Sequence, residues 1–221
     1  MAARTPRVGR GAAGKALEER RRRAMLIGDI LDREYPDAKC ALHYETPEQL
    51  LFATMLSAQC TDVLVNKTTP ALFKSFPSVK EMARAKLEQV EKLVKSVNFY
   101  KTKAKNLIAA SKKIEEEFGG QIPVDIELMT KLPGVGRKTA NVVLGDAFNQ
   151  PHGVVVDTHV KRLVNLIGLA EGDDPVKLEA QLVELLPKER WTKFSHWMIL
   201  HGRSICVARR PKCEECPIRK Y

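Results

Sequence analysis

The sequence lacks a long hydrophobic run, because charged residues break every apolar stretch before the ~20 residues that a membrane-spanning helix needs. Its first 23 residues contain no apolar segment typical of a secretory signal. It also lacks the composition of a disordered chain, since 44% of its 221 residues are hydrophobic. We therefore expect a folded protein with no membrane partner.

Cysteine is scarce and oddly distributed. Three of the five cysteines fall within eleven residues, and an odd number is not typical of a secreted disulfide framework. The pattern instead favours a reducing compartment and a site for a metal or cluster. The five are Cys40, Cys60, Cys206, Cys213 and Cys216.

Positive charge is concentrated at the two ends. The net charge is +10, from 37 Lys and Arg against 27 Asp and Glu. Residues 1–23 contribute 8 − 2 = +6 and residues 201–221 contribute 6 − 2 = +4, whereas the middle is neutral with 23 charges of each sign. This distribution indicates a polyanionic partner, although basic ends are often only solubilising.

Apolar residues recur at three- and four-residue steps almost throughout, which predicts an all-α fold. Gly119-Gly120 predicts a left-handed helix end, and the run 154–156 is too short to indicate a sheet. Helix starts are predicted at Thr46, Ser78, Asp125 and Asp174.

The segment Leu132–Ala140 contains two glycines, Gly134 and Gly136, in a turn that leads into a helix. Glycines allow backbone N–H groups to approach a ligand closely, and a helix N-terminus favours an anion such as a DNA phosphate. An ordinary corner between two helices would use the same glycines, so the spacing alone leaves both interpretations open.

Lys138 lies in the first turn of that helix, where the helix dipole and Arg137 disfavour its ammonium form. A free amine there is a nucleophile that forms a Schiff base with a carbonyl-like carbon, such as C1′ of a sugar. Most lysines are simply solvated surface residues, and the position alone does not decide between the two.

Asp157 follows the apolar run 154–156 at the head of a further helix. A carboxylate there suits a helix cap or a catalytic acid, and the residues alone favour the cap. If Thr158 caps the helix instead, Asp157 is left available for chemistry.

The segments LPGVGRKTANVVL and VVVDTHVKRL resemble the helix-hairpin-helix DNA glycosylase superfamily. The further segments LSAQCTDVLVNK and HGRSICVARRPKCEECP narrow the resemblance to the endonuclease III family, from about residue 24 onward. It implies a DNA glycosylase and apurinic/apyrimidinic lyase that acts on oxidised pyrimidines in double-stranded DNA or on abasic sites. We expect a monomer in the cytoplasm, associated with the nucleoid.

The resemblance also assigns roles to individual residues. Lys138 matches the family's nucleophile and Asp157 its catalytic carboxylate. Gln59 matches the residue that fills the gap left by a flipped base, and Phe99 stands at the apolar wedge position, where Leu is more familiar. The alternatives without a role in DNA binding are an exposed loop residue for Gln59 and a core aromatic for Phe99. Asp62 is expected to be a helix cap. The expected contacts to the DNA backbone are Gly134, Val135, Gly136, Arg137, Thr139, Arg209, Arg210 and Lys212.

The spacing Cys206-x6-Cys213-x2-Cys216 is typical of a soft-metal site. The resemblance implies a [4Fe–4S] cluster, whose fourth cysteine the family places after five more residues. Those five are 217–221, so we expect the natural protein to continue with a cysteine. The five histidines show no ligand spacing and are expected to be structural or surface residues.

The expected organisation is a flexible basic arm (1–23), a six-helix lobe (40–150) with the hairpin at about 125–148, and a cluster lobe made of 24–39 and 151–221. Lys138 and Asp157 are then expected to face each other across a DNA-binding cleft. Two alternatives remain: a pyrimidine-mismatch glycosylase, and a non-catalytic hairpin protein that binds DNA. The adenine-specific branch of the superfamily lacks the lysine.

Overall fold

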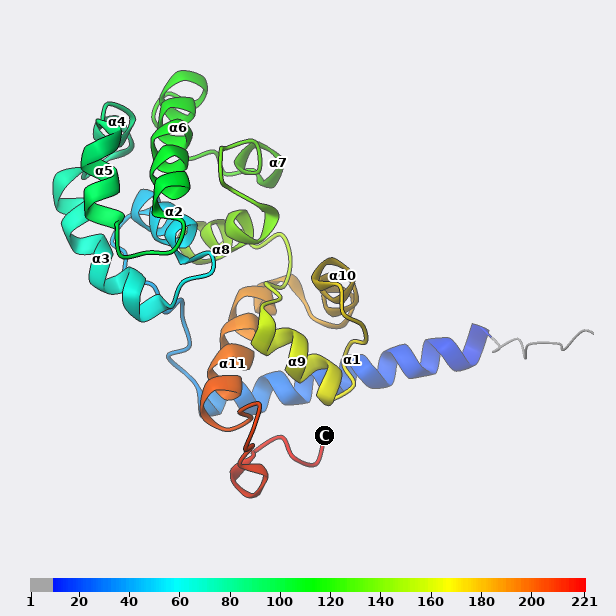
Figure 1. Cartoon of the computed structure of the whole chain (residues 1–221). Coiled ribbons are helices and arrows are strands. Elements are labelled where there is room, and N and C mark those ends of the chain that lie inside the picture. Colours follow the sequence, from blue (N-terminus) through cyan, green and yellow to red (C-terminus); the bar gives the residue numbers. More distant parts are fainter. Residues whose placement is uncertain (1–9) are drawn as a thin grey trace, which may run out of the picture. The chain divides into compact units, whose positions relative to one another are not determined.

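The computed structural model describes residues 10–221, and side chains from residue 14 on. Within that range it contains α-helices, two 3-10 helices and no strand, so the prediction of an all-α fold is confirmed (Figure 1). The chain forms two compact units. The hairpin unit comprises residues 39–152, and the split unit comprises the residues up to 38 together with 153–221. The sequence-based boundaries were 39/40 and 150/151.

The hairpin unit is built around a buried helix. The helix α2 (Pro47–Ser57) is apolar on all sides, and every residue from Leu50 to Leu56 is buried. A helix without a polar face must be surrounded by others, and α2 packs against α3, α6 and α8. Its start is as predicted, because the Thr46 side chain accepts a hydrogen bond from the backbone N–H of Gln49. The other helices of this unit are α3 (Asp62–Ser75), α4 (Val79–Ala83), α5 (Leu87–Val94), α6 (Tyr100–Phe118), α7 (Ile126–Met129) and α8 (Arg137–Phe148).

This unit has seven helices, whereas six were expected. Two of the seven, α4 and α7, are short, with five and four residues. The cap of α3 also differs from the expectation. The hydroxyl of Thr61 accepts the N–H of Leu64, and Asp62 lies in the first turn. A hydroxyl one position earlier reaches the third N–H of the helix, which is the usual geometry of a cap.

The split unit joins distant parts of the sequence. Its long first helix, α1 (Arg10–Glu34), packs against α10 (Pro175–Leu185) and α11 (Trp191–Ser204), and α11 packs against α9 (Thr158–Leu166). In Figure 1, α1 is the blue helix beside the orange α11. The buried side chains Ile27, Leu31, Leu178 and Trp197 belong to its core. Two short 3-10 helices complete it, η1 (Lys188–Arg190) and η2 (Cys213–Glu215).

The expectation of a flexible arm is wrong for residues 10–23, which belong to α1; residues 1–9 lie outside the described part of the chain. This segment is rich in Ala, Leu, Glu, Lys and Arg, which are strong helix formers. Glu18 and Glu19 each pair with an arginine three residues later. Arg21 also donates to the carbonyl of Glu184 at 2.8 Å, and Arg23 donates to that of Ile167. These later segments of the same unit therefore support the helix.

Candidate functional site

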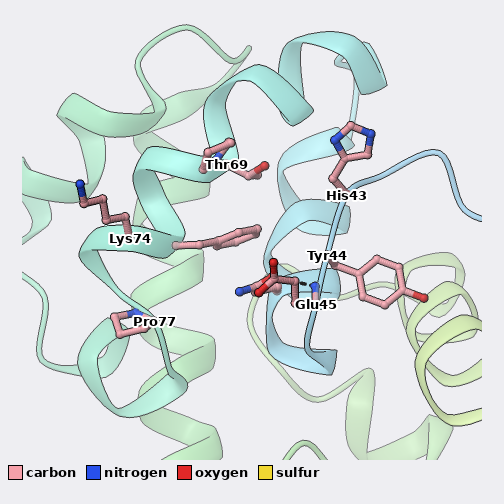
Figure 2. A pocket seen from close by; sticks show the side chains of 9 residues that line it. His43, Tyr44, Glu45, Thr69, Lys74 and Pro77 are labelled. Carbon is pink, nitrogen blue, oxygen red and sulfur yellow. Dashed lines mark hydrogen bonds between the residues drawn. The ribbon is translucent and has the colours of Figure 1, made fainter.

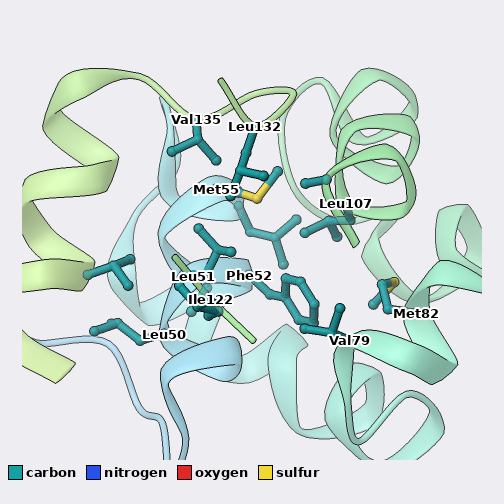
Figure 3. Close-up of a cluster of buried hydrophobic side chains, with 14 of the residues drawn as sticks. Leu50, Leu51, Phe52, Met55, Val79, Met82, Leu107, Ile122, Leu132 and Val135 are labelled. Atoms are coloured by element: carbon teal, nitrogen blue, oxygen red, sulfur yellow. The ribbon is translucent and has the colours of Figure 1, made fainter. Parts of the chain in front are cut away.

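The hairpin turn is held rigidly by the core of its unit. Leu132 and Val135 are 2% and 5% exposed and point into the cluster of side chains around α2 (Figure 3). Gly134 has a φ of +77°, and a Cβ there would lie 2.6 Å from the Asn106 side-chain nitrogen. The first glycine is therefore required both by its backbone conformation and by close packing.

The second glycine is required by neither. Gly136 has an ordinary φ of −90°, and a Cβ on it would meet nothing within 4 Å. It is the N-cap of α8 without a side-chain hydrogen bond, and its carbonyl accepts the first helical bond, from Ala140. The N–H groups of residues 137–139 therefore lie at an uncapped helix N-terminus, which is suited to an anion.

Val135 does not fit the expected role of a phosphate donor. Its side chain is in the core, and its backbone N–H donates to the Leu132 carbonyl at 3.0 Å. The N–H is used to close the turn, so Val135 shapes the hairpin. The other expected hairpin contacts, Gly134, Gly136 and Arg137, are exposed, and Thr139 is half-buried.

Lys138 is the second residue of α8 and is exposed. Within the described part of the chain its ammonium group makes no ion pair or hydrogen bond. Helix α8 packs against α2 and α7, so its first turn is fixed in position. The result is an accessible amine on a rigid element, next to a surface suited to a phosphate.

Asp157 is the N-cap of α9, as the residues alone favoured. Its Oδ1 accepts the N–H of Val160 at 2.8 Å, and the residue is half-buried. The preceding segment is anchored by the buried Val154 and Val156 and by a 2.9 Å hydrogen bond from the N–H of Val155 to the Ser195 hydroxyl. Capping occupies one carboxylate oxygen, and Oδ2 has no partner among the described residues. The cap thus orients a carboxylate that keeps one oxygen for other work.

Gln59 and Phe99 are both exposed, Phe99 by 65%, which excludes the core-aromatic interpretation. The backbone of each lies in the left-handed region, with φ of +53° for Gln59 and +58° for Phe99. Such a backbone costs a non-glycine residue about 1–3 kcal/mol and persists only where its surroundings impose it. The Asn98 side chain donates to the Gln59 carbonyl at 2.7 Å, which joins the two loops.

Sequence reasoning did not identify two residues of this region, Asn98 and Lys103, as site residues. Lys103 is 7% exposed and donates to the carbonyls of Leu56 and Ala58, each at 2.7 Å. A signal existed, because Lys103 stands on the same helix face as the apolar Leu107, one turn later. A lysine on an apolar face must find acceptors when it is buried.

The C-terminal loop brings three thiols into one region of the split unit. The loop is closed by hydrogen bonds from Lys212 N–H to the Ile205 carbonyl (2.9 Å) and from Cys216 N–H to the Cys213 carbonyl (3.3 Å). Burial raises the pKa of the Cys216 thiol, and the nearby Cys206 and Cys213 raise it further. The basic residues Arg209, Arg210 and Lys212 of this loop are exposed.

Polar groups approach two of these sulfurs. The Nη1 of Arg162 lies 3.7 Å from the Sγ of Cys206, and the Nε2 of the buried His201 lies 3.5 Å from the Sγ of Cys216. Burial lowers the pKa of His201, and Arg162 lowers it further. Tyr35 contacts the other ring nitrogen of His201 at 3.0 Å.

The donor chemistry fits a cluster held by thiolates, because the three sulfurs share one loop and a guanidinium faces one of them. The described residues contain no group of three His, Cys, Asp or Glu side chains close enough together to hold a metal ion. Cys40 and Cys60 lie in the other unit, and burial raises the pKa of Cys40 to about 12, so that Cys40 is held as a neutral thiol.

A pocket of about 440 Å³ lies between α2 and α3 of the hairpin unit (Figure 2). It is lined by His43, Tyr44, Phe73 and Lys74 among others, and none of the predicted site residues belongs to it. The Gln49 side chain at its wall already accepts the N–H of Glu45 at 2.8 Å. We assign it no function.

The fold and the hairpin define a class of DNA repair protein. Residues 52–188 match the family model of the HhH-GPD superfamily of base excision DNA repair proteins, and residues 206–221 match the iron–sulfur binding domain of endonuclease III. Endonuclease III from Synechocystis is 48% identical, over 92% of this chain and 93% of its own. Endonuclease III from Bacillus subtilis is 42% identical, over 87% and 86%. A solved structure of a trapped endonuclease III–DNA covalent intermediate matches with a TM-score of 0.84 at 38% identity, over 90% of this chain and 93% of that one.

The chain belongs to the endonuclease III family. It is therefore a DNA glycosylase and apurinic/apyrimidinic lyase of base excision repair with a [4Fe–4S] cluster, which confirms what the family resemblance implied. No helix among the described residues is long and apolar enough to cross a membrane.

Proposed function

We propose that the chain removes oxidised pyrimidines from double-stranded DNA, with Lys138 as nucleophile and Asp157 as the catalytic carboxylate. The observation that carries this proposal is the hairpin. It holds an unpaired, exposed amine in the first turn of α8, beside N–H groups suited to a backbone phosphate. Asp157 contributes an oriented carboxylate from its cap position.

In the proposed reaction the damaged nucleotide is first extruded from the duplex, which costs least for a poorly stacked base. The neutral amine of Lys138 attacks C1′, and the bond between C1′ and the base breaks. The electron pair leaves with the base, which takes up a proton. The Asp157 carboxylate assists removal of the proton from the amine and stabilises the positive charge that develops on the sugar.

The nitrogen lone pair of the adduct then expels O4′ from C1′, and O4′ takes up a proton as the sugar opens. The resulting iminium between Lys138 and C1′ makes the C2′ proton acidic. Loss of that proton expels the 3′ phosphate by β-elimination and cuts the strand on its 3′ side. Water then hydrolyses the imine, which returns the lysine amine.

The remaining residues bind DNA in this proposal. Gln59 occupies the space of the flipped base, where its amide bonds to the orphaned partner base, and Phe99 wedges between base steps. The N–H groups at the start of α8 and the exposed residues Arg209, Arg210 and Lys212 contact phosphates. Cys206, Cys213 and Cys216 would hold the cluster, which supplies order to the basic loop. We propose that the protein acts as a monomer at the nucleoid.

The nucleophile is tested by reducing the imine with borohydride on DNA that carries an abasic site. The parent should give a covalent protein–DNA adduct and Lys138→Ala none, because the alanine variant has no amine at that position. The control is Lys112→Ala, which removes another exposed lysine, from α6. Trapping by Lys138→Ala at the parental level would show that another amine attacks.

The substrate class is tested with duplexes that contain thymine glycol, an oxidised cytosine, uracil or a mismatched thymine. We expect base release from the first two and little from the others. Preferred release of the mismatched thymine would instead make the chain a mismatch glycosylase. DNA binding without release of any of these bases would contradict the proposal that oxidised pyrimidines are the substrates.

A further inference from the structure

The two residues proposed to enter the DNA share an unusual backbone. Among the described residues only Gln59, Phe99 and Asn149 combine a side chain with a positive φ. Asn149 is the C-cap of α8, where asparagine commonly adopts this conformation. Gln59 is the third residue of a turn closed by the Cys60 N–H on the Ser57 carbonyl (3.0 Å), a position that takes a positive φ but is usually glycine or asparagine. Phe99 directly precedes α6, and bulky side chains rarely adopt this backbone.

One exposed side chain joins their loops. Gln59 lies between α2 and α3, and Phe99 lies between α5 and α6, 40 positions further on. The Nδ2 of Asn98 donates to the Gln59 carbonyl at 2.7 Å, so the residue before Phe99 holds the backbone of Gln59. Nearby, the hydroxyls of Thr68 and Ser96 are 3.0 Å apart and link α3 to the second loop.

A buried lysine fixes both sides of the same junction. The Nζ of Lys103 donates to the carbonyls of Leu56 and Ala58, at the end of α2 and directly before Gln59. A cation there complements the negative end of the helix dipole and satisfies carbonyls without helical partners. The backbone N–H of the same residue donates to the Phe99 carbonyl at 3.0 Å. The Lys103 side chain thus holds the carbonyl that precedes Gln59, and it does so from the residue whose backbone makes the first helical bond of α6 with Phe99.

We propose that Asn98 and Lys103 are positioning residues that preset the backbones of Gln59 and Phe99 for entry into the duplex before DNA is bound. This inference rests on the proposed roles of Gln59 and Phe99. Neither positioning residue needs to touch DNA. Their benefit is that a conformation otherwise rarely populated is already present, so that binding energy is not spent on reaching it.

Asn98→Ala tests this without disturbing the core, because Asn98 is exposed. Without the side-chain donor the Gln59 loop should sample other conformations, and the fraction of molecules ready for insertion should fall. We expect single-turnover excision from an intact lesion duplex to slow about tenfold, since apparent affinity falls with that fraction. Strand cleavage at a preformed abasic site should change less than about twofold, because less unstacking is needed there.

A double-mutant cycle then separates positioning from general loosening. If Asn98 acts through Gln59, Asn98→Ala should slow the parent but have no further effect on a Gln59→Ala variant. An equal slowing in both backgrounds would overturn the inference. No slowing by Gln59→Ala alone would remove the proposed role of Gln59 itself, and the positioning role with it. Borohydride trapping by Lys138 would be unaffected by that result.

Lys103→Met supplies an independent arm, because methionine keeps the apolar stem and removes only the donor. Lys105→Met is the matched control, an exposed lysine on the same helix that carries the same charge. Lys103→Met should reproduce the contrast between intact lesion and abasic DNA, and fluorescence of 2-aminopurine opposite the lesion should rise less on binding. Equal loss on both substrates at unchanged melting temperature would contradict positioning. If Lys103→Met fails to fold, the Asn98 cycle decides alone.

Discussion

At the scale of single residues, Asp157 combines two roles that the sequence presented as alternatives. Its Oδ1 caps α9, and the same bond orients the carboxylate. Asparagine caps helices about as well as aspartate does, whereas alanine loses about 1 kcal/mol. The two substitutions therefore act on different roles.

We expect Asp157→Asn to keep the melting temperature and DNA affinity of the parent but to lose most base excision, because the amide cannot take up a proton or balance positive charge. Asp157→Ala should lose excision as well. It should also melt at a lower temperature, because the missing cap lowers the free energy of unfolding by ~1 kcal/mol. Thermal melting, DNA binding and single-turnover excision check this pair. Near-parental excision by Asp157→Asn would show that Asp157 is a cap alone.

How far the site could be predicted also depends on the residue. Lys138 and Gly134 stand in a contiguous motif, so their local setting follows from neighbours in the sequence. Asn98 and Lys103 act through partners 39 to 47 positions away, and no periodic pattern records such contacts. Val135 was assigned to DNA because it lies between two glycines, but its burial depends on α2, which the motif does not contain.

At the scale of elements, helices were predictable where one face is apolar and a cap is present. The predicted starts at Asp125 and Asp174 are confirmed, since each side chain accepts a backbone N–H of its helix. The N-terminal part of α1 was missed because its exposed, charged residues resemble a solvated arm. Its ion pairs and its contact with Glu184 decide otherwise.

The hairpin makes a prediction in which its two glycines behave differently. Gly134→Ala forces a Cβ onto a left-handed backbone and into Asn106, so it should cost at least the ~1–2 kcal/mol of that conformation. Gly136→Ala meets no atom and has an ordinary φ, so it should cost no more than the ~1 kcal/mol by which alanine is a poorer N-cap than glycine. Its methyl group should nevertheless weaken DNA binding if a phosphate approaches this turn.

Chemical denaturation and DNA titration at fixed salt measure the two effects separately. Because a phosphate contact is independent of sequence, the loss in Gly136→Ala should be similar for damaged and undamaged duplexes. Unchanged affinity of Gly136→Ala for both would argue against a phosphate at the start of α8.

At the scale of the whole molecule, the two units are not consecutive segments. Helix α1 packs with α10 and α11, more than 140 positions later, so one unit is interrupted by the other. Composition does not mark such a division, because both units are built from helices of the same kind, with buried apolar residues. The boundary expected before the structure came from family resemblance, and periodicity alone did not supply it.

The cluster loop allows stability to be assigned to one unit. Cys213 is exposed, and serine differs from it by one atom, so Cys213→Ser has no packing cost. Any loss of stability must then come from ligation. In the cluster-loaded protein we expect the melting temperature to fall by roughly 4–8 °C, which corresponds to about 2 kcal/mol for a chain of this size. After the cluster is removed, parent and variant should melt together.

Hydrogen exchange should locate this loss. Amide protection should fall in the last turn of α11 and in residues 205–218, which include the thiols and the backbone bonds that close the loop. Protection of α2 and α6 should stay at the parental level, because both lie in the hairpin unit. DNA affinity should fall with the order of the basic loop, while Lys138 should still be trapped on abasic DNA once the duplex is saturated with protein. A melting difference that persists in the cluster-free protein would show instead that Cys213 stabilises the loop by packing.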